Sequence, residues 1–201
     1  MQFRRLRKRQ KPFRSTKPII LVVCEGKETE PNYFIALRQT KRINKERLII
    51  SYGERGSHPR NVIEDAKDKK KKFEAANLEV NEVWCVFDRD DHKKIEAAFN
   101  QARDNHFKIA FSNPCFELWY LLHCQDQTAH IERGKVFSRL KKYIPQYQKS
   151  LNVYPDLLVH QSQAINRAKK LRKYHRDNLD SEMKNPSTNV DELVSYLNSL
   201  K

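Results

Sequence analysis

The sequence predicts an α/β fold in which a central, mostly parallel sheet of about four strands is flanked by helices. Two observations predict it. Short apolar runs alternate with longer segments of helical pattern through the first 125 residues, which is the order of a β-α-β chain. The apolar runs are also continuous instead of alternating with polar residues, as expected of strands covered on both faces. After about Gln125 the strand signals fade, which predicts a helical C-terminal part.

The expected strands are runs rich in β-branched and aromatic residues. They are Pro18–Cys24 (PIILVVC), Leu48–Tyr52 (LIISY), Glu82–Phe87 (EVWCVF) and Phe107–Ser112 (FKIAFS). The helical patterns between and after them cover Glu30–Arg42, Arg60–Asn77, Asp91–Asn105 and Cys115–His123. The C-terminal part adds helices over Gly134–Ile144, Pro155–Leu179 and Val190–Leu200, the last with Ser187 or Thr188 as its cap. We therefore expect a catalytic core over residues 18–125 and a helical extension over 126–201 that packs on it.

Positive charge is concentrated at the N-terminus. The chain carries 40 basic and 25 acidic residues, a net charge of +15, and the first 17 residues hold eight basic residues and no acidic one. We expect residues 1–17 to form a disordered arm in which Arg4, Arg5 and Arg7 contact nucleic acid phosphates. The helix around Ala164–Arg176 is the second basic segment, and its candidate contacts are Arg167, Lys170 and Lys173. A solvated helix face is an equally good interpretation of that segment.

The sequence favours a cytoplasmic protein with no membrane segment. It has no run of 18 apolar residues, no apolar stretch typical of a secretory signal, and no Cys-x-x-Cys pair among its four cysteines. A zinc site could be drawn from Cys115, His123, Cys124 and His130, but this spacing matches no structural zinc module.

Acidic residues follow the first and third expected strands. Glu25 comes directly after the first strand, and Asp88 and Asp90 end the third. Ligands of open α/β sheets bind beyond the carboxyl ends of the strands, so these three carboxylates are expected to converge there. Close carboxylates repel unless a cation neutralises them, and oxygen ligands suit Mg²⁺ or Mn²⁺. This arrangement predicts a metal site for phosphoryl-transfer chemistry. The alternative is that Glu25 caps the next helix and that Asp88 and Asp90 lie in an ordinary turn.

The order Glu25-Gly26, then Asp88-x-Asp90, resembles the Toprim domain of topoisomerases, bacterial primases and OLD-type nucleases. Longer motifs resemble the RloB family: CEGKETEPNYF (24–34), FDRD (87–90), SNPCFELWYLLH (112–123) and NPSTNV (185–190). The resemblance implies a Toprim-like fold, a metal-dependent nuclease site and a role as effector in bacterial phage defence beside an AAA- or ABC-type ATPase. It maps Glu25 onto the acid/base or metal-binding glutamate, and Asp88 and Asp90 onto the metal-binding aspartates.

Other polar residues are expected near the same edge. Toprim members often carry an acid four residues after the glutamate, where this chain has Thr29, and its Glu30 comes one residue later. Glu117, at the start of the helix after the fourth strand, is a further catalytic candidate. Lys27, His58 and Arg60 are candidates for phosphate contact, although a plain turn explains the last two equally well.

The predicted function is therefore a Mg²⁺- or Mn²⁺-dependent nuclease that cuts DNA or RNA, including tRNA. The alternative is a noncatalytic nucleic-acid-binding module regulated by a partner; whether the chain forms a homo-oligomer is left open. No G-x-x-x-x-G-K-[ST] motif is present, so the chain is not itself expected to be the ATPase. Phosphatases of the haloacid dehalogenase type carry Asp-x-Asp after the first strand, and a glycosyltransferase would need a nucleotide-sugar pocket that nothing in the sequence indicates.

Overall fold

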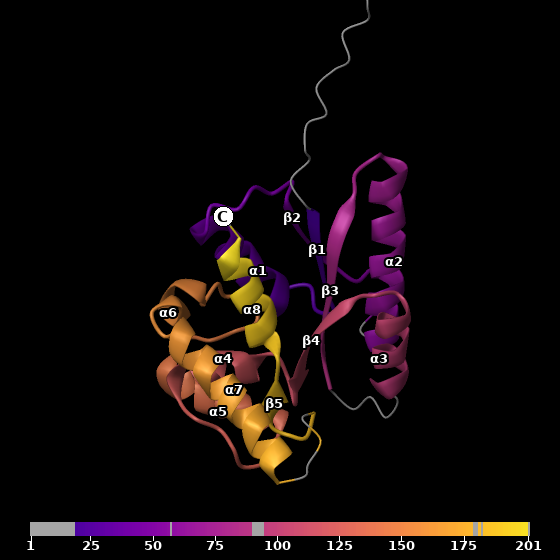
Figure 1. The fold of residues 1–201 in the computed structure, drawn as a ribbon. Coiled ribbons are helices and arrows are strands. Elements are labelled where there is room, and N and C mark those ends of the chain that lie inside the picture. Colours follow the sequence, from indigo (N-terminus) through magenta and orange to yellow (C-terminus); the bar gives the residue numbers. More distant parts are fainter. Residues whose placement is uncertain (1–18, 57, 90–94, 179–180, 182, 201) are drawn as a thin grey trace, which may run out of the picture.

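The computed structural model describes residues 19–56, 58–89, 95–178, 181 and 183–200. Its central sheet has five strands in the order β2-β1-β3-β4-β5 (Figure 1). They are β1 (Ile19–Cys24), β2 (Leu48–Tyr52), β3 (Val80–Asp88), β4 (Lys108–Asn113) and β5 (Ser187–Thr188). The first four are parallel and β5 is antiparallel to β4. The predicted α/β class with a mostly parallel sheet is confirmed, and the arrangement is Rossmann-like.

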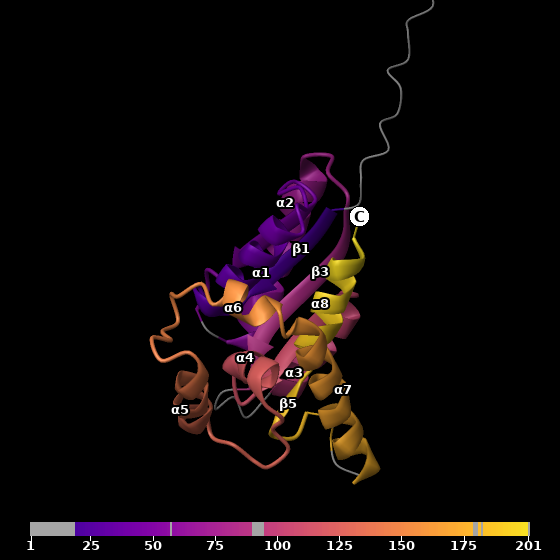
Figure 2. The same ribbon diagram turned by 90° about the vertical axis from the view of Figure 1, so that its left-hand side faces the viewer.

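Helices cover both faces of the sheet. The helices are α1 (Thr29–Thr40), α2 (Pro59–Ala75), α3 (Ile95–Asp104), α4 (Glu117–Cys124), α5 (Arg133–Tyr143), α6 (Tyr154–Leu158), α7 (Gln161–Asp177) and α8 (Val190–Ser199). Figure 1 shows α2 and α3 on one side of the sheet, and α1, α4, α7 and α8 on the other. Figure 2 shows α5 at the margin of the molecule, joined to its neighbours by long loops.

The alternation of side chains along each strand supplies two cores. Ile20 and Val22 belong to the large core shared with α1, α4, α7 and α8, whereas Leu21 and Val23 belong to the core shared with α2 and α3. Successive residues of a strand point to opposite faces, so a continuous apolar run is what a doubly covered strand requires. This explains why the strands could be recognised from such runs.

The register places the end of β3 beyond the end of β1. Cys24, the last residue of β1, lies opposite Val86, and Asp88 lies opposite Ser112 of β4. The chain after β1 continues beside β3, because the Glu25 amide donates to the carbonyl oxygen of Val86 at 2.8 Å. Glu25 and Asp88 are thereby fixed at the same edge of the sheet.

The C-terminal part contributes to the sheet as well as packing on it. Short strand β5 pairs with the end of β4. Just after it, the side chain of Asn189 accepts from the Phe111 amide at 2.7 Å and donates to the Ile109 carbonyl oxygen at 3.0 Å. Ser187 and Thr188 therefore lie in a strand, and the residue before the last helix is Asn189, although Thr188 Oγ1 does accept from the Val190 amide.

Two other expectations need correction. The sheet has five strands, not about four, because β5 was not recognised. The helix expected over Pro155–Leu179 is two helices, α6 and α7, with a turn at Val159 and His160. The expected arm over residues 1–17 lies outside the described residues. None of the helices in the described part of the chain is long and apolar enough to cross a membrane.

Candidate functional site

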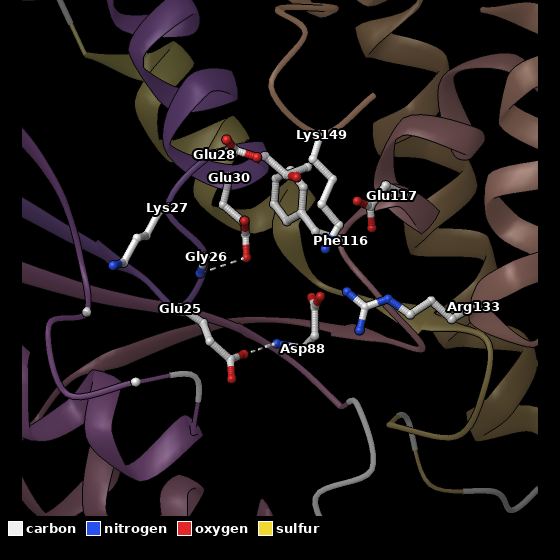
Figure 3. Close-up of a pocket in the computed structure, with 13 residues that line it drawn as sticks. Glu25, Gly26, Lys27, Glu28, Glu30, Asp88, Phe116, Glu117, Arg133 and Lys149 are labelled. Atoms are coloured by element: carbon white, nitrogen blue, oxygen red, sulfur yellow. Dashed lines mark hydrogen bonds between the residues drawn. The ribbon is translucent and has the colours of Figure 1, made fainter. Parts of the chain in front are cut away.

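A cleft of about 670 Å³ opens where the carboxyl ends of the parallel strands meet the first turns of α1 and α4. Figure 3 shows the side chains of Glu30, Asp88, Glu117, Arg133 and Lys149 around one space, with the Lys27 side chain extending away from it. The residues that line it are Glu25, Gly26, Lys27, Glu28, Thr29, Glu30, Gly53, Gly56, Asp88, Phe116, Glu117, Arg133 and Lys149. The cleft therefore contains four of the acidic residues singled out from the sequence: Glu25, Glu30, Asp88 and Glu117.

Glu25 and Asp88 lie side by side at the floor of the cleft (Figure 3). Glu25 Oε2 accepts from the backbone amide of Asp88 at 3.1 Å, and both side chains are buried. This contact joins the residue after β1 to the last residue of β3. The structure thus shows that the first and third strands are neighbours and that Glu25 and Asp88 line the same cleft.

Glu30 is held over Gly26. Its Oε1 accepts from the Gly26 amide at 3.3 Å, and a Cβ at position 26 would collide with the Glu30 carboxylate. Burial first, and then the neighbouring carboxylates of Glu117 and Glu25, raise the pKa of Glu30 from its ordinary 4.5 to about 7. This residue, which was only a secondary candidate in the sequence, is an integral part of the acidic cluster.

Glu117 is the first residue of α4 and is 1% exposed. Its Oε1 accepts from the Tyr147 hydroxyl at 3.0 Å. Tyr147 belongs to the chain after α5, and burial together with the Glu117 charge raises the pKa of its phenol. The neutral hydroxyl therefore remains a donor to Glu117 and ties that chain segment to the site.

Three cations line the same cleft. Lys27 is exposed, and its Nζ lies 6.0 Å from the centre of the Tyr52 ring. Arg133 begins α5 and is half-buried, while Lys149 is exposed on the chain between α5 and α6. In Figure 3 the Arg133 guanidinium extends toward Asp88. The cleft is therefore mixed in charge: Glu25 and Asp88 lie at the sheet edge, and Arg133 and Lys149 lie on the opposite side together with Glu117 (Figure 3).

The loop after β2 forms another part of the cleft through Gly53 and Gly56. Buried Asp65 of α2 organises this loop: its Oδ2 accepts from the Glu54 amide at 2.8 Å, and its Oδ1 lies 3.5 Å from Arg55 Nε. The Gly53 amide donates to the carbonyl oxygen of Cys24 at 2.8 Å. Asp65 therefore fixes the loop beside the end of β1.

The donor set fits a hard divalent cation. Glu25 and Asp88 offer oxygen ligands only, and Mg²⁺ binds one or two carboxylates together with waters and phosphate oxygens. Burial is the main cause of the raised pKa of Glu30, and the charges of Glu117 and Glu25 add to it. Among the described positions, no three His, Cys, Asp or Glu side chains form a group that could hold a metal ion. Asp90, the third expected ligand, lies outside the described residues.

The other predicted phosphate-contacting residues do not line this cleft, as far as the described part of the chain shows. His58 precedes α2, and its Nδ1 accepts from the Arg60 amide at 3.2 Å. On α7, Arg167 donates to the carbonyl oxygens of Leu122 and His123 and therefore caps the end of α4.

Elsewhere on α7, Lys170 and Lys173 are exposed, and Lys173 pairs with Asp177 at 2.6 Å. Arg4, Arg5 and Arg7 lie outside the described residues. The four residues of the zinc alternative are Cys115, His123, Cys124 and His130. In the described ranges, no three cysteine, histidine or acidic side chains lie close enough together to bind a metal ion.

No sequence pattern indicated Arg133, Tyr147 or Lys149. They lie in segments with ordinary helical or loop patterns, and only tertiary folding carries them to the cleft. Asp65 was equally hidden, because a buried aspartate inside a highly charged helix resembles its solvated neighbours. Glu30 did carry a signal, its spacing after Glu25-Gly26, and was named on that ground as a weaker candidate.

Comparisons with known proteins agree with the motifs. Residues 20–197 match the sequence model of the RloB-like protein family. Neither the curated proteins nor the solved structures gave a match to this chain. The matched segment runs from β1 to α8 and includes the whole cleft, so the chain belongs to the RloB-like protein family.

Proposed function

We propose that this protein is a metal-dependent nuclease of the Toprim type that hydrolyses phosphodiester bonds in DNA or RNA, including tRNA. The observation that carries the proposal is the contact between Glu25 and Asp88. The Glu25 carboxylate accepts from the backbone amide of Asp88, and both buried acidic residues line a cleft at the carboxyl edge of a parallel sheet that also holds cations. Ligand sites of open α/β sheets lie at this edge.

Each side chain has a role in this proposal. Glu25 and Asp88 would hold Mg²⁺ or Mn²⁺, with Asp90 as the expected third ligand. When bound, such a metal lowers the pKa of a bound water and stabilises charge on the phosphate and the leaving oxygen. The Asp88 amide orients Glu25, and the absence of a side chain at Gly26 leaves room for the Glu30 carboxylate above the Gly26 amide. Glu117 is held in place by Tyr147.

The test is cleavage of labelled plasmid, single-stranded DNA and total tRNA by the purified protein, with Mg²⁺, with Mn²⁺ and with EDTA. We expect metal-dependent cleavage that falls at least 100-fold in Glu25→Gln and in Asp88→Asn. Glu46→Gln and Asp104→Asn are matched controls, because both residues are exposed and lie outside the cleft. Cleavage that persists in Glu25→Gln and Asp88→Asn would refute the assignment of the site.

A noncatalytic nucleic-acid-binding module is the second candidate. The observation that favours it is the basic surface of α7, where Lys169, Lys170, Lys173 and Arg176 are exposed. In that case no substrate is cut, and salt-sensitive binding is unchanged in Glu25→Gln and Asp88→Asn. Replacement of Lys169 and Lys170 by Gln would then weaken binding, with a smaller dependence on salt.

The resemblance to the RloB family supports a wider proposal. The protein would act in the cytoplasm as an effector of abortive infection, restrained or triggered by an AAA- or ABC-type ATPase. All four cysteines are free, as suits a reducing compartment. Induction of the gene alone and with its neighbours tests this: we expect growth arrest that depends on Glu25 and on the gene arrangement. Equal growth in every arrangement would count against an effector.

A further inference from the structure

The cleft has two walls of opposite chemistry. The sheet-edge wall carries the buried carboxylates of Glu25 and Asp88, with that of Glu30 from α1 above them. The fourth buried carboxylate, Glu117 at the start of α4, lies on the other side of the cleft (Figure 3). The other wall comes from the chain that follows α4 and carries Arg133 and Lys149. Figure 3 shows the Arg133 side chain extending toward Asp88, with the Lys149 side chain reaching into the same space beside Phe116. Both cations therefore face the carboxylates of Glu25 and Asp88 across the cleft.

Each of these cations follows an anchored residue by two positions. The amide of Ile131 donates to Asn185 Oδ1 at 2.9 Å, and Asn185 Nδ2 donates back to the Ile131 carbonyl oxygen at 2.9 Å. Tyr147, two residues before Lys149, is buried and bound to Glu117. The wall is thus fastened on both sides of α5, which positions the two cations reproducibly.

The charges decide where a phosphate can attach. A carboxylate and a phosphate about 4 Å apart repel by roughly 4 kcal/mol at the effective dielectric constant near a protein surface. The sheet-edge wall alone therefore disfavours an anionic substrate. The planar guanidinium group of Arg133 can donate two hydrogen bonds to two oxygens of one phosphate, and Lys149 adds a compact positive charge. The cleft volume of about 670 Å³ is in the range for a ligand of nucleotide size.

We propose that Arg133 and Lys149 form the phosphate-binding site of this cleft and hold the backbone of a nucleic acid strand against the carboxylate wall. This inference rests on the proposed function, since it names where the substrate of that function is held. It concerns binding, however, so it can be tested without any cleavage.

The test is the binding of a fluorescein-labelled twelve-nucleotide thymidylate strand, followed by fluorescence anisotropy over a range of NaCl concentrations with EDTA present. Each phosphate contact with a single strand contributes about 0.7 to the slope of log affinity against log salt. We expect the double variant Arg133→Gln/Lys149→Gln to lower this slope by about 1.4 and the affinity by about tenfold or more.

The matched control is Lys141→Gln/Lys142→Gln, which makes the same change in charge on exposed residues of α5 that do not line the cleft. It is expected to bind within about twofold of the wild type, with its slope retained. If the two double variants behave alike, the effect is one of net charge, and the proposed site is wrong. Wild-type binding by the cleft variant would also overturn it.

A second variant covers the case in which the double variant fails to fold. Arg133→Lys keeps the positive charge but cannot donate two parallel hydrogen bonds to a phosphate. We therefore expect several-fold weaker binding of the thymidylate strand, with the slope of log affinity against log salt retained. Melting curves establish that each variant is folded, and Arg133→Lys that binds like the wild type would exclude a bidentate contact. Binding that depends on Arg133 without cleavage in any metal would support this site while refuting the nuclease.

Discussion

Replacement of Glu30 by Gln is expected to stabilise the protein above neutral pH. The Glu30 carboxyl is buried among other acids, and its pKa is raised from 4.5 to about 7. Between these values the folded protein binds more protons than the unfolded chain, so the free energy of unfolding falls as the pH rises. A tenfold change in proton affinity is worth about 1.4 kcal/mol, so the ionised side chain costs about 3 kcal/mol above pH 7.

The Glu30→Gln variant keeps an acceptor oxygen for the Gly26 amide and has no charge to bury. Urea unfolding in EDTA at several pH values between 4 and 8 measures the effect. Relative to the wild type, the variant should gain about 3 kcal/mol as the pH rises from 4.5 to 7.5. Effects of titrating groups that do not interact with Glu30 cancel in this difference.

Glu28→Gln is the control, because Glu28 is exposed two residues earlier in the chain. It should follow the wild-type pH dependence. A difference between Glu30→Gln and the wild type that stays constant over this pH range would refute the reasoning, since it would show that Glu30 titrates alike in the folded and unfolded chain.

Two further predictions concern stability and use urea unfolding at pH 7. Tyr147→Phe removes a buried hydrogen bond to a carboxylate and should cost about 1.5–3 kcal/mol, whereas Tyr143→Phe, which removes an exposed one, should cost about 0.5 kcal/mol; equal losses would contradict the role given to the buried bond. Arg172 donates two hydrogen bonds to buried Asp191, and Asp191→Asn, which weakens this ion pair, should lower the free energy of unfolding by about 3 kcal/mol. The control is Asp177→Asn at the exposed pair with Lys173, which should lower it by less than about 1 kcal/mol. A loss below about 1 kcal/mol in Asp191→Asn would mean that the buried pair is not needed for folding.

The floor of the cleft could be predicted because its residues depend on strand order alone. Glu25 and Asp88 follow continuous apolar runs, and the carboxyl ends of parallel strands share an edge. The start of α4 after β4 likewise placed Glu117 at this edge. Local sequence patterns were sufficient for these three positions.

The rest depended on contacts that leave no local pattern. Strand β5 has two residues and forms only because the end of β4 offers it a partner. Tyr154, Leu157, Gln161 and Ala164 are spaced as on one continuous helix, so the turn between α6 and α7 interrupts no periodicity. Arg133 and Lys149 reach the cleft through long-range hydrogen bonds of their neighbours, which a sequence pattern cannot express.

The double hydrogen bond between Ile131 and Asn185 has a consequence for synthesis on the ribosome. A domain generally folds as a unit once its chain has emerged from the ribosome. The carboxylates of the cleft come from residues 25–117, whereas the anchor that precedes Arg133 needs an amide side chain made more than fifty residues later. A nascent chain therefore completes the basic wall of the cleft only after Asn185 has left the exit tunnel. The cleft cannot reach its full form on a chain that is still being translated through that segment.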